Sequence, residues 1–216
     1  WTKPSFNQSQ IREINQELGQ IKNLIQTGKF SVSKEKLNSL QSKYPNLDTS
    51  SWWSNYHRSL GYRKTKQNNF YEAVIQYRKA FDYKANEITL NSLATAYIQN
   101  KQFFDASSLL ESNPNLISKA NKVKYEQRIA YTYAKMQNFQ GAIYRTKNLI
   151  NMEPNNPQHW STISQYYMKN SQAEEALEAL DRLGSIRPLK HSEKQLRIRA
   201  SQKNKLGNQH DVAISS

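Results

Sequence analysis

Apolar residues recur at steps of three and four along most of the chain, which is the period of an amphipathic α-helix. The first stripe lies on one helical face and contains Ile11, Ile14, Leu18, Ile21, Leu24 and Ile25. Gly28 interrupts it and Phe30 follows. A second stripe through Leu37 and Leu40 stops at Pro45, because proline cannot continue a helix. Residues 1–50 therefore predict a helix–turn–helix.

The same arrangement returns at a nearly constant interval. Two neighbouring units match residue for residue at one constant interval. The first unit has Ile129, Ala130, Tyr133, Ala142 and Pro154, and the second has Ile163, Ser164, Tyr167, Ala176 and Pro188 at the corresponding places. Leu60-Gly61 and Leu93-Ala94 occupy the same places in two earlier units. Self-similarity at such a period indicates a chain built from stacked helix pairs, none of which can bury its apolar face alone.

A large residue followed by Leu-Gly, Tyr, Ala, Phe and Pro in about 34 residues is the pattern of the tetratricopeptide repeat (TPR), which these units resemble. The resemblance implies an all-α fold, a TPR-type right-handed α-solenoid of antiparallel helix pairs with about ten to twelve helices. We expect a degenerate helical repeat at 1–50, repeats at 54–86, 87–122, 123–156 and 157–190, and a truncated repeat at 191–216. In 87–122 the second helix should be irregular, because Pro114 ends it early and extra residues follow. In 191–216 a second helix should start near Asp211, and the segment after Leu206 should be frayed.

Two positions in each unit are occupied by small residues. They are Gly61, Ala94, Ala130 and Ser164 at position 8, and Ala73, Ala106, Ala142 and Ala176 at position 20. This pattern predicts that the paired helices approach closely there. Trp52 and Trp53 are expected to pack between the degenerate repeat and the next.

Composition narrows the classes of protein. The chain has 216 residues and no cysteine, which excludes disulfide frameworks, zinc fingers and thiol nucleophiles. No apolar run approaches the roughly 20 residues that span a bilayer. The sequence does not distinguish a cytoplasmic from a periplasmic location. The chain begins at Trp1 without a methionine, so we expect a fragment or processed product.

Catalytic patterns are missing from the sequence. The four histidines lie far apart, and no nucleophile-elbow, phosphate-loop or zinc-protease motif occurs. Four acids, Glu174, Glu175, Glu178 and Asp181, fit a solvated face near a helix N-terminus. The sequence therefore predicts no enzyme activity for this region, although it could belong to a larger enzyme, and no cofactor or metal.

The net charge of +14 favours an anionic partner, with a lysine-rich surface that serves solubility as the alternative. In the TPR family the first helices line a concave groove, which binds peptides or partner proteins. The resemblance places these residues on that groove as ligand-binding candidates: Arg58, Tyr62, Lys66, Asn91, Lys124, Arg128, Tyr131, Lys135, Gln165, Lys169 and Arg199. No Asp or Glu falls on the groove positions, and Arg58, Lys124, Arg128 and Lys135 are expected to converge. Lys22 and Lys29 are expected to lie outside the groove.

The resemblance implies a non-catalytic scaffold that binds a protein or acidic peptide through a basic groove. The alternative is the TPR region of a larger carbohydrate-active or polysaccharide-assembly protein, such as a glycosyltransferase, a sulfotransferase or an export component, which binds an anionic polysaccharide. Nucleic-acid binding is a weaker option. A clamp for chaperone tails is also weak, since Lys124 and Arg128 match its last pair but Tyr62 and Ser92 replace two asparagines.

Overall fold

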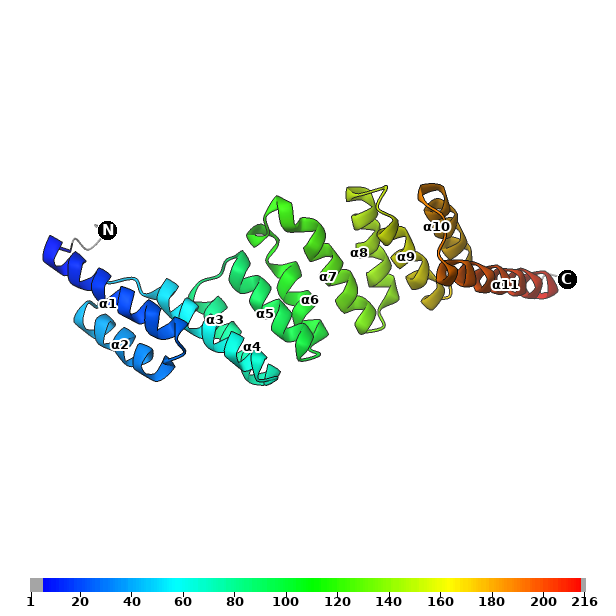
Figure 1. Ribbon diagram of the computed structural model, residues 1–216. Helices are drawn as coiled ribbons and strands as arrows, with labels where there is room; N and C mark the ends of the chain where they lie inside the picture. Colours follow the sequence, from blue (N-terminus) through cyan, green and yellow to red (C-terminus); the bar gives the residue numbers. More distant parts are fainter. Residues whose placement is uncertain (1–5, 215–216) are drawn as a thin grey trace. The chain divides into compact units, whose positions relative to one another are not determined.

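The computed structural model describes residues 6–214, and their side chains as far as Lys205. Within that range the chain forms eleven α-helices, two short 3-10 helices and no strand (Figure 1). The helices are α1 (Gln8–Gln26), α2 (Phe30–Lys43), α3 (Ser50–Lys66), α4 (Phe70–Tyr83), α5 (Glu87–Gln99), α6 (Phe103–Ser112), α7 (Lys122–Lys135), α8 (Phe139–Met152), α9 (Pro157–Lys169), α10 (Ala173–Ile186) and α11 (His191–Ile214). The all-α prediction is confirmed. None of the described helices is long and apolar enough to cross a membrane.

Helices α1 to α10 form antiparallel pairs, in which an odd-numbered first helix is followed by an even-numbered second helix (Figure 1). The turn inside each pair contains one residue with positive φ: Gly28, Asn68, Lys101, Gln137 or Ser171. Each of them shortly precedes the first residue of the second helix. The spacing between the last four equals the spacing between the repeats in the sequence, including the longer step from Lys101 to Gln137. The left-handed residue therefore marks the same point in every repeat, including the first.

The small positions are buried as predicted. The alanines at position 20 are all fully buried: Ala73, Ala106, Ala142 and Ala176. At position 8, Gly61, Ala94, Ala130 and Ser164 are buried as well. Because neither position carries a long side chain, the backbones of the paired helices can approach closely. Trp53 lies in the core formed by α1, α2 and α3, and Trp52 packs against that core while remaining partly exposed.

The chain divides into two compact units between Leu109 and Leu110, within α6. In the first unit one apolar cluster joins α1, α2 and α3, and another joins α4, α5 and α6. In the second unit a cluster joins α8, α9, α10 and α11. Stacked helix pairs thus share their cores with the next pair, as expected when each repeat buries its face against a neighbour.

Helix α6 is only 10 residues long, whereas α4, α8 and α10 each have 14. Two 3-10 helices, Pro114–Leu116 and Lys119–Asn121, fill the connection from α6 to α7. Pro114 lacks the backbone N–H that an α-helix would use, which favours the change to a tighter turn. This connection accommodates the longer step between the repeats at 87–122 and 123–156.

The expectation of a second helix starting near Asp211 is wrong, because α11 continues without a break to Ile214. The sequence contains no proline here, and the single Gly207 costs a helix only about 1 kcal/mol. In the preceding repeat, Ile163 and Tyr167 of the first helix α9 pack against the second helix α10. In α11 the equivalent residues are Arg197, which pairs with Asp181 at 2.6 Å, and Ser201. The side chains after Lys205, on which fraying was predicted, lie outside the described residues.

Candidate partner-binding surface

In the second unit, α9 and α11 enclose a pocket of about 640 Å³. Three of the residues predicted from sequence, Gln165, Lys169 and Arg199, line it together. Lys203 adds a third cation one turn after Arg199, and Met168 and Leu196 supply apolar surface. The pocket therefore combines positive charge, amide donors and an apolar wall.

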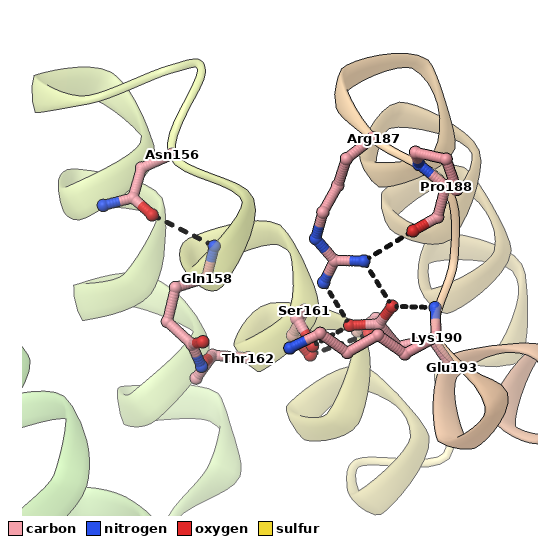
Figure 2. A network of polar contacts seen from close by, with 9 residues as sticks. Asn156, Gln158, Ser161, Thr162, Arg187, Pro188, Lys190 and Glu193 are labelled. Carbon is pink, nitrogen blue, oxygen red and sulfur yellow. Dashed lines mark hydrogen bonds and ion pairs between the residues drawn. The ribbon is translucent and has the colours of Figure 1, made fainter.

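Glu193 is the one acid among the described residues that line this pocket, and its charge is already neutralised. Figure 2 shows Arg187 facing its carboxylate, to which it donates two hydrogen bonds of 2.8 and 2.6 Å. The backbone N–H of Lys190 and the hydroxyl of Ser161 donate two more, at 2.8 and 2.9 Å. Glu193 is 5 % exposed. The hydrogen bonds from Arg187 are the main reason that the pKa of Glu193 falls to about 2.

The same network fixes the positions of three elements. Ser161 belongs to α9, Glu193 to the first turn of α11, and Arg187 to the connection after α10. A bidentate guanidinium–carboxylate pair holds a defined geometry as well as adding energy. Because the carboxylate already accepts four hydrogen bonds, an approaching anion meets Lys169, Arg199 and Lys203 with no free acid among the lining side chains that the structure describes.

Helix α7 carries four further candidates. Lys124 and Lys135 are exposed, and Lys135 Nζ lies 5.3 Å from the ring centroid of Tyr131. Tyr131 is 43 % exposed, so both members of the pair reach solvent. Arg128 is half-buried, and burial lowers the pKa of its guanidinium. Lys124 and Lys135 are therefore the candidate cations of α7 that are more available to a ligand than Arg128.

Helix α3 carries three of the four candidates of the first unit. Arg58 is exposed and donates to the side-chain oxygen of Asn55 at 3.2 Å. Tyr62 is 58 % exposed, and Lys66 Nζ lies 5.4 Å from its ring centroid. Asn91, on α5, is half-buried. Arg58 belongs to the first unit whereas Lys124, Arg128 and Lys135 belong to the second, so the convergence of these four stays a prediction.

No family model and no curated protein sequence matches the chain. Solved structures do resemble it. YrrB, described as a TPR protein with an unusual peptide-binding site, is 17 % identical and has a TM-score of 0.57 over 86 % of this chain and 90 % of its own. The C-terminal part of a TPR-containing protein from Cytophaga hutchinsonii is 14 % identical, with a TM-score of 0.58 over 87 % and 71 %. MamA from Desulfovibrio magneticus RS-1 is 13 % identical, with a TM-score of 0.54 over 76 % and 98 %.

The chain has the TPR fold. Four pairs of residues on the first helices share one register, because each pair occupies positions 9 and 13 of the repeat. They are Tyr62 and Lys66, Tyr131 and Lys135, Gln165 and Lys169, and Arg199 and Lys203. Because the two positions are one helical turn apart, their side chains lie on the same helical face. Lys203, which the sequence reasoning missed, follows Lys169 by one repeat length.

The position expected for Lys22 has to be corrected. It was expected to lie outside, yet it lines a pocket of the first unit together with Arg58. The signal was present in the sequence. Lys22 precedes Tyr62 by the same interval that separates Phe30 from Phe70, the first residues of the second helices in the first two repeats. Lys22 is therefore at position 9 of the first repeat.

Proposed function

We propose that this chain is a non-catalytic TPR scaffold that binds an acidic segment of a partner protein along the basic face of its first helices. The observation that carries the proposal is the pocket between α9 and α11, where Lys169, Arg199 and Lys203 face no free acid. Arg199 can bind a carboxylate through two nitrogens, and the lysines act as point charges. A concave cationic site concentrates anions and speeds their encounter.

Neutral groups of the same pocket support a peptide as the ligand. Gln165 and Gln202 can donate to and accept from a peptide backbone, and Met168 and Leu196 can pack against apolar side chains. A ligand that carried charge alone would leave this part of the wall unused. A protein segment with carboxylates and apolar residues matches all three kinds of surface.

The test is a charge-reversed variant, Lys169→Glu with Arg199→Glu, titrated calorimetrically with acidic peptides and with heparin-like oligosaccharides at low salt. The matched control is Lys147→Glu with Arg182→Glu, which changes the same charge on the second helices α8 and α10. We expect peptide binding to fall at least tenfold in the first variant and to stay within twofold in the control. Equal losses in both variants would make binding a property of the whole basic surface. Binding of the oligosaccharide alone would favour the anionic glycan instead.

A further inference from the structure

The pocket of the first unit that contains Lys22 lies between the first helices α1 and α3 and has a volume of about 550 Å³. Lys22 comes from α1, and Arg58 from α3. Gln26 and Asn55 add amide groups, and Trp52 and Ile25 supply apolar surface. Within the part of the chain that the structure describes, neither Asp nor Glu lines this pocket.

The absence of acids from this pocket has a structural cause. The two glutamates of α1 are engaged on its other side, where Glu17 binds Lys36 of α2 at 2.9 Å. Glu13 accepts a hydrogen bond of 2.7 Å from Tyr44 and also pairs with Lys43. Helix α3 has four cations and no acid in its sequence, Ser50–Lys66. The acids of α1 therefore neutralise lysines of α2 and leave the cations of the α1–α3 pocket uncompensated.

Arg58 and Trp52, which both line the pocket, are held in place by different interactions. Arg58 is oriented by its hydrogen bond to Asn55, at 3.2 Å. Trp52 packs with one part of its ring system on the core of α1, α2 and α3 and keeps the rest accessible. A half-buried indole offers a large contact area at low conformational cost, which is why tryptophan is enriched among residues that dominate binding.

We propose that this pocket anchors an acidic segment of a partner protein, with a carboxylate held by Lys22 and Arg58 and a neighbouring apolar side chain packed on Trp52. The inference rests on the proposed function in taking a protein segment as the partner. It adds a second, chemically distinct contact in the first unit, in which charge and an aromatic surface act on adjacent residues of the ligand. A ligand that lacks the carboxylate would not contact Lys22 and Arg58 through a charge, and one that lacks the apolar side chain would not pack on Trp52.

The experiment uses the full chain and three synthetic octapeptides: one with a carboxylate next to phenylalanine, one with the matching amide next to phenylalanine, and one with the carboxylate next to glycine. Binding is followed by calorimetry and by tryptophan fluorescence. We expect the first peptide to bind at least tenfold more tightly than the others and to change the fluorescence. The double variant Lys22→Ala with Arg58→Ala should lose at least tenfold in affinity. Trp52→Phe, which keeps a ring on the core, should lose the fluorescence change.

The matched control is Lys34→Ala with Lys79→Ala, which removes two exposed cations from the second helices α2 and α4. Its affinity for the first peptide should stay within twofold. Equal affinity of the parent and the Lys22/Arg58 variant would overturn the inference, as would equal binding of the amide peptide. If that variant binds normally while the Lys169/Arg199 variant does not, this inference fails and the proposed function stands. If no acidic peptide binds at all, both fail.

Discussion

The ring of Tyr133 lies directly against Gly141, so that a Cβ atom at Gly141 would come within 2.8 Å of Tyr133 Cδ1. The ring is held in place because its hydroxyl donates to Glu111 at 2.9 Å. In the first unit a similar close approach is made by Gly61 and the ring of Tyr77, at 3.0 Å. The two pairs lie at different positions of the repeat, and the glycine belongs to the second helix in one pair and to the first helix in the other.

This contact predicts opposite effects for two glycine substitutions. Gly141→Ala should lower the free energy of unfolding by roughly 1–2 kcal/mol, because overpacking outweighs the gain in helix propensity. Gly19→Ala should raise it by about 0.5–1 kcal/mol, since no atom lies within 4 Å of the added methyl group. Chemical denaturation of both variants measures the difference. Equal stabilisation by the two alanines would show that the ring of Tyr133 moves freely.

The alanines at position 20 give a second test of the register. Ala142 and Ala176 are fully buried between paired helices. Replacing either with leucine should cost roughly 1–3 kcal/mol, because the helices cannot separate without losing contacts along their whole length. Thermal melts check this. A melting temperature equal to that of the parent for both variants would contradict the packing.

The left-handed turn residues predict sites where glycine stabilises the fold. Lys101 and Gln137 have φ values of 61° and 58°, a region that costs a non-glycine residue about 1 kcal/mol or more. Lys101→Gly and Gln137→Gly should each raise the free energy of unfolding by roughly 0.5–1 kcal/mol. The neighbouring Asn100 has φ of −82°, so Asn100→Gly should destabilise the chain instead. Denaturant titration compares the three, and a gain for Asn100→Gly as large as for Lys101→Gly would refute the explanation.

The ion pair of Glu193 predicts a pH dependence. Its pKa is about 2 in the folded chain, below the ordinary 4.5, so the unfolded chain takes up a proton first as the pH falls. The contribution of Glu193 is therefore complete above about pH 4.5 and is lost between that value and about pH 2. The difference in unfolding free energy between the parent and Glu193→Gln should shrink across this window.

At neutral pH, Glu193→Gln should cost roughly 2–4 kcal/mol, because it leaves Arg187 without its carboxylate. Glu178→Gln, on an exposed residue of α10, should change stability by no more than about 0.5 kcal/mol. A constant difference between the parent and Glu193→Gln from pH 7 to pH 2 would show that Glu193 is not the group that titrates.

The predicted convergence of the basic residues leads to a further test, on α7. Lys124→Glu with Lys135→Glu should weaken the binding of the acidic peptide that the α9–α11 pocket binds, by about threefold to tenfold if both helices contact one ligand. The affinity of the parent should also fall as salt rises, since the screening length shortens to about 8 Å at physiological ionic strength. An unchanged affinity in the α7 variant would separate α7 from the binding surface.

The periodic residues predicted the helix pairs because their positions are fixed by packing. Ala142 and Ala176 have to be small, and Ile129 and Ile163 have to be apolar, whatever the partner is. The partner of Glu193 could not be predicted in the same way, because Arg187 and Glu193 meet across the turn at Pro188, where no helical spacing applies. A second helix was expected to start near Asp211, but the sequence specifies no turn before Asp211, and the single Gly207 does not end α11.

The groove was only partly predictable. Gln165, Lys169 and Arg199 meet in one pocket because first helices stack in register. Lys22 was misplaced because the interval from the first repeat to the second is longer than any later one, so that its register was not applied. Trp52 was assigned to packing alone, whereas part of its surface is also open to the α1–α3 pocket. A side chain that serves the core and a pocket together cannot be recognised from residue type.

The pairing of Glu13 and Glu17 with lysines of α2 has a kinetic consequence for the first unit. An anion that diffuses toward the pocket between α1 and α3 meets Lys22 and Arg58 with no competing negative charge on the pocket wall. Such a field orients a ligand before contact and raises the association rate constant. The dissociation rate constant depends instead on short-range contacts such as the one with Trp52. Added salt should therefore slow the arrival of a partner far more than it hastens its departure.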